Sequence, residues 1–366
     1  MINGQTVAVI GAGVAGLAAA TALAQRGAQV TVYEQAAGLA PVGAGLQISP
    51  NGARVLAELG IELAAVESQA VELRNFADGR RVLRLDLTGD RYGLPFKLAH
   101  RADLIDALAR AARATGVTLA FGEAVEADQL EADVIVGADG VKSRMRPALN
   151  GDAEPFFTGQ VAWRAVVEDA AAPEAHVYMG PGRHLVTYPL IGGRRNIVAV
   201  EERIDWVDED WDLADDPASL RQAFLEFAPE VGAMLEKVEA VKLWGLFRHP
   251  VAARWQDGRQ VLIGDAAHPT LPFLAQGANL ALEDAYVLAR HLETKPSADA
   301  LATFEAARKP RVTRAIRAAN GNARNYHITD PWARWVAHTG LRAVDRLAPG
   351  MMLARFDWLY GFDPTA

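Results

Sequence analysis

Three glycines near the N-terminus have the spacing of a phosphate-binding turn. Gly11, Gly13 and Gly16 directly follow the β-branched run 6–10 and open an alanine-rich segment. The first glycine permits a tight turn, the second lets a pyrophosphate approach the backbone, and the third lets a helix pack closely on a strand. Phosphates would then lie on free N–H groups at the positive end of the helix dipole, in the turn that also contains Ala15.

An acidic residue completes this unit. Residues 29–33 form a second strand-like run, and Glu34 follows it directly. A carboxylate at this place accepts hydrogen bonds from a ribose diol and repels a 2′-phosphate. The strand, turn, helix, second strand and acid together predict a dinucleotide-binding βαβ unit. The glycine spacing does not distinguish FAD from NAD, and a glycine-rich turn without a ligand is the alternative.

Two further motifs follow along the chain. Residues 133–146 read DVIVGADGVKSRMR, and residues 261–285 read VLIGDAAHPTLPFLAQGANLALEDA. In each motif a strand ends in a turn that brings an aspartate, Asp139 or Asp265, to its carboxyl end, where ligands collect in open α/β sheets. An ordinary Asp-Gly hairpin turn is the alternative for the first motif. In the second, a loop rich in Pro and Gly precedes a predicted helix over 278–293.

The three motifs, in this order, resemble those of the single-component flavoprotein aromatic hydroxylases, the family that includes para-hydroxybenzoate hydroxylase. The salicylate hydroxylase and 3-hydroxybenzoate 6-hydroxylase branch is the most similar. The resemblance implies an α/β fold with a glutathione reductase-like, Rossmann-like FAD domain, a mixed-sheet substrate domain and C-terminal helices. It implies a tightly bound, non-covalent FAD whose adenosine ribose contacts Glu34. The resemblance also implies NADH or NADPH as a transient reductant, and the absence of a second glycine-rich βαβ unit from the sequence fits this.

The same resemblance assigns further contacts with FAD. Asp265 would lie on the ribityl chain, and Arg101 near the phosphates and ribityl. Amides at the start of the helix after the third motif would face the flavin N1 and O2, where negative charge collects on reduction. A surface arginine capped by Asp103 is the alternative for Arg101, and a solvated helical face is the alternative for Glu283 and Asp284. The predicted cofactor-binding residues are Gly11, Gly13, Ala15, Gly16, Glu34, Gln47, Arg101, Asp139, Gly264, Asp265, Gly277, Ala278 and Asn279.

A substrate site is expected on a strand over 184–190. Alternation places His184, Val186 and Tyr188 on one face, where two polar rings and an apolar residue suit a flat aromatic substrate with one or two oxygens. The His and Tyr resemble the substrate-contacting pair of the hydroxybenzoate branch, and deprotonating or hydrogen-bonding a phenol would activate the ring. Ordinary packing is the alternative for both. Relatives often have a polar residue or histidine where this chain has the apolar residues 271–274, so the partner of the substrate phenol stays open. Pro272, which would shape the face of the flavin, and Phe273 are predicted to contact the substrate.

Composition narrows the classes of partner. The chain has 366 residues, with 37 Lys and Arg against 45 Asp and Glu and a net charge of −8. This balance, without a basic run, argues against nucleic-acid or anionic-membrane partners. Cysteine is absent, which excludes disulfides and thiolate metal sites, and no metal is expected. Residues 7–24 are apolar but glycine-punctuated and follow an uncharged start, so the expected location is cytoplasmic.

The motifs also suggest how the chain is divided. A helix is predicted from Pro217 to about Glu236, and the segment 309–346 and aromatic tail 356–360 would either cover the FAD domain or form a homodimer contact. The predicted parts are a discontinuous FAD-binding domain of 1–72, 97–156 and 250–310, a substrate domain of 73–96 and 157–249, and a C-terminal helical segment of 311–366.

The sequence therefore predicts an FAD-dependent monooxygenase that hydroxylates an aromatic acid or phenol with NAD(P)H and dioxygen. By resemblance, hydride reduces FAD, oxygen adds at flavin C4a, and the distal oxygen of the hydroperoxide passes to the ring. Two alternatives remain, a monooxygenase or epoxidase of a non-aromatic substrate on the same fold, and a non-catalytic FAD-binding regulatory protein. A flavin halogenase is disfavoured, because its Trp-x-Trp-x-Ile-Pro signature is missing around Trp163.

Overall fold

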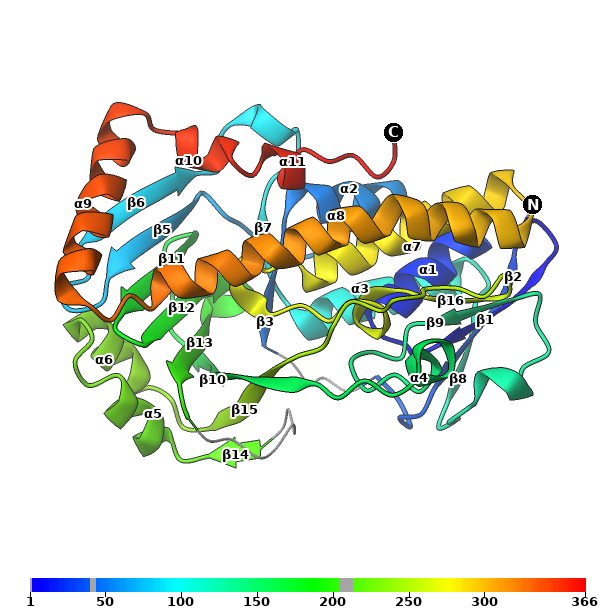
Figure 1. Ribbon diagram of the computed structural model, residues 1–366, viewed down its shortest axis with the longest axis horizontal. Coiled ribbons are helices and arrows are strands. Elements are labelled where there is room, and N and C mark those ends of the chain that lie inside the picture. Colours follow the sequence, from blue (N-terminus) through cyan, green and yellow to red (C-terminus); the bar gives the residue numbers. More distant parts are fainter. Residues whose placement is uncertain (1, 40–43, 205–212) are drawn as a thin grey trace.

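The protein is an α/β molecule with its strands in separate sheets (Figure 1). The computed structural model describes residues 2–39, 44–204 and 213–366. Over these ranges the strands form a five-stranded, an eight-stranded and a three-stranded sheet. In the same ranges, no helix combines the length and apolar character needed to span a membrane.

The five-stranded sheet is parallel and carries the N-terminal unit. Its inner strands Val134–Gly137 and Thr6–Ile10 are short and largely buried, in keeping with their β-branched composition, whereas the edge strand Thr118–Phe121 is partly exposed. The helix α1 (Val14–Ala24) packs between this sheet and α7 (Gly277–Thr294), and α3 (Arg101–Ala114) lies beside α1. In spatial order the strands are β16 (Gln260–Leu262), β9 (Val134–Gly137), β1 (Thr6–Ile10), β2 (Gln29–Glu34) and β8 (Thr118–Phe121).

The eight-stranded sheet is antiparallel except where β5 and β11 pair in parallel. One face is covered by the short helices α5 (Pro217–Ala223) and α6 (Pro229–Leu235), whose apolar side chains share a core with the sheet. The other face is the one on which a substrate is predicted to bind. In spatial order the strands are β14 (Leu213–Asp215), β15 (Val241–Arg248), β10 (Phe156–Glu168), β13 (Arg194–Glu202), β12 (Arg183–Leu190), β11 (Glu174–Gly180), β5 (Ala70–Asn75) and β6 (Arg81–Asp86).

The helix predicted over 217–236 is instead two helices, α5 (Pro217–Ala223) and α6 (Pro229–Leu235). Pro229 stands at the start of the second helix, where its missing N–H removes no helical hydrogen bond. The residue before a proline disfavours the helical conformation, and Ala228 is extended, with φ −50° and ψ 148°. The prediction of one continuous helix was therefore wrong.

A small sheet and one long helix connect the two larger sheets. The three-stranded sheet has the order β3 (Gly45–Ile48), β7 (Lys97–His100), β4 (Val66–Glu67), and β7 also contacts β12. The helix α8 (Ser297–Tyr326) has 30 residues, about 45 Å at 1.5 Å per residue. Figure 1 shows it running along the long axis, beside α7 at one end and toward the eight-stranded sheet at the other. The remaining helices are α2 (Pro50–Glu58), α4 (Met145–Asn150), α9 (Pro331–Leu347), α10 (Met351–Ala354) and α11 (Asp357–Tyr360).

The aromatic tail packs on the molecule. Phe356, Trp358 and Tyr360 lie against the core around the parallel sheet, so the tail covers this part of the protein, as one of its two predicted roles required. On α9, Trp332 and Trp335 are exposed and stack with ring centroids 5.0 Å apart. A homodimer stays a prediction, as do the domain boundaries, one of which falls between residues 72 and 73, inside β5.

Candidate active site

The turn between β1 and α1 has the geometry of a phosphate-binding turn. Gly11 has φ +105°, and a Cβ there would lie 2.4 Å from the carbonyl oxygen of Ala138. At Gly16 a Cβ would lie 1.9 Å from the Gly11 carbonyl oxygen. At Gly13, by contrast, a Cβ would have no described atom within 4 Å, and no side-chain cap from the described residues satisfies the α1 N-terminus. Open space and free N–H groups thus coincide where an anionic ligand group would bind.

Glu34 closes β2 directly beside this turn. Its Oε2 accepts a hydrogen bond from the Ala12 amide at 2.9 Å, and its Oε1 accepts one from the Ala36 amide at 2.9 Å. These contacts fix the carboxylate next to the α1 N-terminus while leaving it partly exposed. Its remaining lone pairs are suited to a ribose diol, as the sequence predicts.

Asp139 follows β9 at the same edge of the parallel sheet. One carboxylate oxygen, Oδ2, accepts hydrogen bonds from the amides of Arg144 and Met145 at 2.8 and 3.3 Å, at the start of α4. The other, Oδ1, is buried and has no hydrogen-bond partner among the described residues. A buried acceptor of this kind is costly unless a ligand or water completes it, which fits a nearby bound cofactor.

The third motif packs directly on the glycine turn. Gly264 has φ +59°, and a Cβ there would lie 2.8 Å from the Cβ of Ala15. The next residue, Asp265, is accessible to solvent, although protein packed around it raises the pKa of its carboxyl by burial, against the positive charges of His268 and Arg101. A carboxylate that is enclosed and still reachable is suited to the hydroxyl groups of a bound ligand.

The N-terminus of α7 lies behind the same loop. Its helix begins at Gly277 without a side-chain cap from the described residues, so the first-turn amides of Gly277, Ala278 and Asn279 are available to an acceptor. The Asn279 side chain has another role, because it accepts from the Ser49 amide at 2.9 Å and donates to the Gln47 carbonyl at 3.0 Å. Asn279 thus offers a ligand its backbone, while its side chain joins β3 to α7.

A fully buried ion network holds the third motif in place. Asp284 accepts from the Gly264 amide at 3.0 Å, from His268 at 2.5 Å and from Arg308 at 2.7 Å. Arg308 also pairs with Glu283 at 2.6 Å, and all four of these side chains are buried. A solvated helical face for Glu283 and Asp284 is therefore wrong. The sequence does contain their partners, Arg308 and Arg311 in the next helix, but a single sequence cannot show that these arginines face the two acids.

This network keeps its acids ionised. Burial alone would raise the pKa of Asp284, but His268, Arg308 and the Gly264 amide together lower the pKa of Asp284 to about 2. The pKa of Glu283 is likewise lowered, since the positive charges of Arg308 and Arg311 outweigh the effect of burial. His268 stacks on Trp255 with ring centroids 5.1 Å apart, so it supports the loop from within.

The predicted substrate residues share one face of β12. His184 is buried, with its ring centroid 5.7 Å from that of Phe273 and 5.3 Å from that of Tyr326. Because Phe273 lies four residues before Gly277, His184 lies close to the start of α7. Pro272 precedes Phe273 in the same helical turn.

Tyr188 contacts β3, the strand that contains the predicted cofactor residue Gln47. It is buried, and a Cβ on Gly45 of β3 would lie 2.6 Å from the Tyr188 Cε2. Val186, between the two rings, is half-buried and pairs with Val198 of β13. The structure thus brings the face of β12 together with both the loop before α7 and the strand that contains Gln47.

A cation on this face was missed by sequence reasoning. Arg164 of β10 pairs with Val198, in the same cross-strand row as Val186, and its guanidinium lies 4.0 Å from the ring centre of Trp244. Burial lowers the pKa of Arg164 to about 10, and the charge of Arg101 acts in the same direction. The alternation of β10 could have placed Arg164 on a face, but not beside Tyr188.

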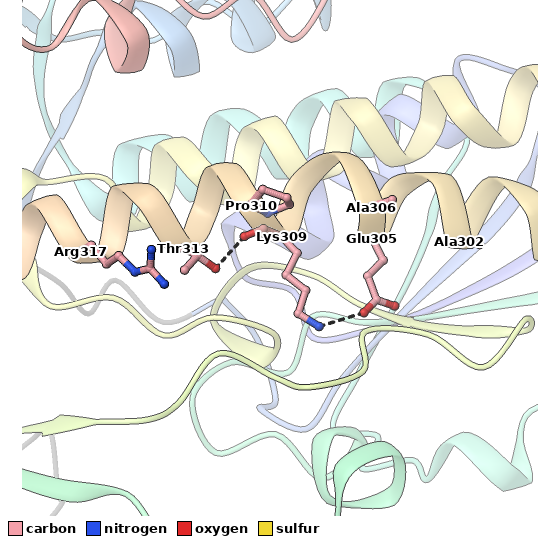
Figure 2. A pocket seen from close by; sticks show the side chains of 7 residues that line it. All are labelled: Ala302, Glu305, Ala306, Lys309, Pro310, Thr313 and Arg317. Atoms are coloured by element: carbon pink, nitrogen blue, oxygen red, sulfur yellow. Dashed lines mark hydrogen bonds and ion pairs between the residues drawn. The ribbon is translucent and has the colours of Figure 1, made fainter.

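A surface pocket along α8 lies away from these residues. It has a volume of about 550 Å³ and follows one side of α8, where Lys309 pairs with Glu305 at 3.1 Å (Figure 2). None of the predicted site residues lines it, so this pocket is separate from the predicted substrate site. The lining residues are Ala302, Glu305, Ala306, Lys309, Pro310, Thr313 and Arg317.

One group of side chains has the arrangement of a metal site. Possible ligand atoms of Glu72, Glu174 and His176 lie within 4.8 Å of one another. Arg84 donates to both carboxylates, at 3.0 and 2.7 Å, and Arg74 donates to Glu72 at 2.6 Å. The acids are thus neutralised by arginines, and the group is an ion-pair network that joins β5, β6 and β11.

Comparisons with known proteins agree with this geometry. A protein of Streptomyces cremeus named 3-amino-4-hydroxybenzoate 2-monooxygenase is 38% identical over 353 residues, covering 88% of each chain. The 3-hydroxybenzoate 6-hydroxylase of Polaromonas naphthalenivorans is 32% identical and covers 98% of this chain and 96% of its own. The solved structure of Klebsiella pneumoniae HpxO complexed with FAD and uric acid is 26% identical, with a TM-score of 0.83 over 98% and 97% of the two chains.

A family model described as an FAD binding domain matches residues 5–319. The elements within this span include the α1 turn with its open Gly13, Glu34 beside it, and the uncapped start of α7 at Gly277. These residues fit FAD, since they offer an anion-binding helix terminus, a diol acceptor and a second free helix terminus. The chain is a flavin-dependent enzyme that belongs to the FAD-binding aromatic hydroxylase family.

Proposed function

We propose that this protein hydroxylates an aromatic acid or phenol, using NADH or NADPH and dioxygen, with the predicted residues as its site. The observation that carries the proposal is the contact of His184 with Phe273. It brings a polar ring on the sheet face to the loop that leads into the α7 N-terminus. An aromatic ring between these elements would lie beside the bound flavin and beside groups that can handle a phenolic proton.

The two polar rings have complementary protonation states. Burial, together with the nearby His327, holds the pKa of His184 well below its usual range, so His184 is neutral at pH 7 and one of its ring nitrogens can accept a hydrogen bond from a phenol. Burial raises the pKa of the Tyr188 phenol, against the charge of Arg164, so Tyr188 keeps its proton and can donate a hydrogen bond. His184 would deprotonate the substrate phenol, and Tyr188 would orient an oxygen of the substrate.

Arg164 gives the site a charge preference. Its guanidinium is enclosed, so an anion placed beside it would interact through a low local dielectric. The relatives act, by name, on hydroxybenzoates, which are aromatic acids. We assign Arg164 to the substrate carboxylate and expect an anionic aromatic substrate to bind more tightly than its neutral analogue.

The protein holds FAD mainly through backbone groups. The α1 turn at Gly13 would bind the pyrophosphate, Glu34 the adenosine ribose, Asp265 the ribityl hydroxyls, and the first amides of α7 from Gly277 the pyrimidine ring. When bound, FAD supplies the redox chemistry that activates dioxygen. The chain contributes binding, orientation and exclusion of water.

The proposal is tested with purified protein reconstituted with FAD. NADH and NADPH oxidation is followed against a panel of hydroxybenzoates, aminohydroxybenzoates and hydroxypyridine acids, while peroxide and products are quantified. One acid should accelerate oxidation and give hydroxylated product with little peroxide, and His184→Asn should retain FAD but lose most of this product. Bound FAD without stimulation by any member of the panel would contradict the proposal.

A second candidate substrate class has one observation in its favour. The loop residues Leu271 and Leu274 are apolar, and the HpxO structure with a TM-score of 0.83 was solved with uric acid, which is not a benzoate. Stimulation by purines or other non-benzenoid rings, with none by aromatic acids, would favour this class.

A further inference from the structure

A chain of three polar side chains leads from the substrate face to the surface. The Nδ1 of His184 lies 2.5 Å from the Nε2 of His327, which follows α8. The other ring nitrogen of His327, Nδ1, lies 2.8 Å from Oε1 of Glu202 at the end of β13. His184 and His327 are 2% and 5% exposed, whereas the Glu202 side chain is 48% exposed. The chain therefore begins in the interior and ends at solvent.

The hydrogen-bond chemistry of this chain fixes which nitrogen carries a proton. An ionised carboxylate only accepts, so the Nδ1 of His327 is the donor to Glu202. Burial lowers the pKa of His327 and of His184, which keeps both rings neutral. The Nε2 of His327 is then an acceptor, and the Nδ1 of His184 must donate to it. The amide of Gln160, at 3.3 Å from the same Nδ1 of His327, is a longer contact than Glu202.

One atom is left with a free lone pair, the Nε2 of His184. It makes no hydrogen bond with any described residue, and its ring lies among those of Phe273, Tyr326 and His327. In this tautomer the free nitrogen is a proton acceptor on the substrate face. Without the carboxylate of Glu202 at the other end of these hydrogen bonds, neither ring would be held in this tautomer.

From this geometry we infer a proton relay, His184 to His327 to Glu202, that removes the phenolic proton of the substrate to solvent. The inference rests on the function proposed above and assigns roles to two residues that no motif contains. His184 touches the substrate, while His327 and Glu202 act through it and are positioning residues.

The transfer balances without another reactant. The substrate O–H bond breaks as a proton moves to the Nε2 of His184, and the Nδ1 proton of His184 passes to the Nε2 of His327. The Nδ1 proton of His327 then passes to Glu202 and leaves to water. The substrate is left as a phenolate and one proton appears in solvent. In each ring the proton has moved from Nδ1 to Nε2, and both tautomers reset when a proton from solvent returns along the same path and His184 gives its Nε2 proton back to the phenolate oxygen.

The surroundings of the relay contain few competing charges. From α8, Tyr326 faces His184 with a neutral phenol, because burial raises the pKa of Tyr326 to about 12. On β12 and β13, Arg183 and Glu201 pair with each other at 2.9 Å, next in sequence to His184 and Glu202. The charged group in direct contact with a relay histidine is therefore the carboxylate of Glu202.

The test compares His327→Gln and Glu202→Gln with the wild-type holoenzyme, using the best hydroxylated acid from the panel above. Glutamine can hydrogen-bond at both positions but cannot pass a proton on. Stopped-flow mixing with a pH indicator measures proton release on substrate binding, and phenolate absorbance follows the same event. We expect release to slow at least tenfold in both variants, in the range by which general bases act.

The pH profile supplies the readout that a purely structural role would not change. For His327→Gln, kcat at pH 7 should fall at least tenfold and recover toward pH 10, where a phenol with a pKa of about 10 ionises without a base. His338→Gln is the matched control, because His338 is also buried, on α9, and contacts Asn75 outside the relay. It should keep the wild-type profile.

The outcomes separate the relay from the proposed function. Hydroxylation by the wild type, with wild-type proton release and pH profile in both variants, would overturn the relay. If His327→Gln does not fold, the exposed Glu202→Gln decides alone, by its rate of proton release. A wild type that hydroxylates no phenolic substrate would instead overturn the proposed function.

Discussion

Gly11 and Gly13 lie two residues apart, yet an added methyl group would have opposite consequences at the two positions. Gly13 has φ −81°, which alanine adopts, and its Cβ would have no described atom within 4 Å. Gly13→Ala should therefore fold normally and weaken FAD binding at least tenfold, about 1.4 kcal/mol, because the methyl group fills the space of a phosphate. Flavin content and FAD titration by fluorescence measure this.

The matched variant is Gly11→Ala. Its positive φ and the 2.4 Å approach to Ala138 require the backbone to shift, so this variant should lose folding stability as well as FAD. Wild-type FAD affinity in Gly13→Ala would show that the open space at Gly13 does not hold the cofactor.

Arg164 gives a second prediction at the scale of one side chain. Arg164→Met should raise the KM for the aromatic acid about 10- to 100-fold, since a charge-assisted contact contributes about 1.5–3 kcal/mol. The KM for the matching phenol without a carboxylate should change little. Arg195→Met, which removes a cation from the opposite face of the same sheet, is the control. An equal loss for acid and phenol would contradict the assignment.

At the scale of elements, α7 and α8 are joined by the buried network of Asp284, Glu283 and Arg308. Asp284→Asn leaves Arg308 and His268 without their shared anion, so we expect a loss of about 3–5 kcal/mol in the free energy of unfolding. Urea denaturation measures it. Glu293→Gln on the same helix removes the exposed acidic partner of Arg26 and should cost at most about 1 kcal/mol. Similar losses in the two variants would contradict the role of the network.

The same network predicts that the free energy of unfolding falls at low pH. The pKa of Asp284 is about 2 in the folded protein and about 3.9 in an unfolded chain. Because the folded pKa is lowered, the contribution is complete above pH 4 and is lost as the pH falls toward 2. The free energy of unfolding should therefore drop across this window and drop less steeply in Asp284→Asn. Parallel slopes for the two proteins would count against the assignment.

The elements also show what a sequence can and cannot predict here. Glycine spacing and strand alternation depend on neighbours in the chain, and they located the α1 turn, the α7 start and the common face of His184 and Tyr188. Glu283, Asp284 and His327 depend on partners 16 to 143 residues away, which no local pattern encodes. Pro229 was visible in the sequence, and its effect as a helix start was underestimated.

For the whole molecule, FAD should be a large part of its stability. The predicted contacts come from β1–α1, β2, the loop before α7 and α7 itself, so bound FAD joins segments far apart in the sequence. At free FAD one hundred times its Kd, mass action adds about 2.7 kcal/mol to the free energy of unfolding. Removal of FAD should lower the Tm, and re-addition should restore it in a concentration-dependent way. An unchanged Tm on removal would contradict the proposed placement.

The most direct test of the central claim is the origin of the new ring oxygen. The reconstituted enzyme is supplied with NADH or NADPH, the accepted aromatic acid and ¹⁸O-labelled dioxygen. The mass of the product is then measured by mass spectrometry. The proposed function predicts one ¹⁸O atom in each hydroxylated product and none when only the water is labelled. A product oxygen that comes from water, or NAD(P)H oxidation that yields only peroxide, would contradict the assignment as a monooxygenase.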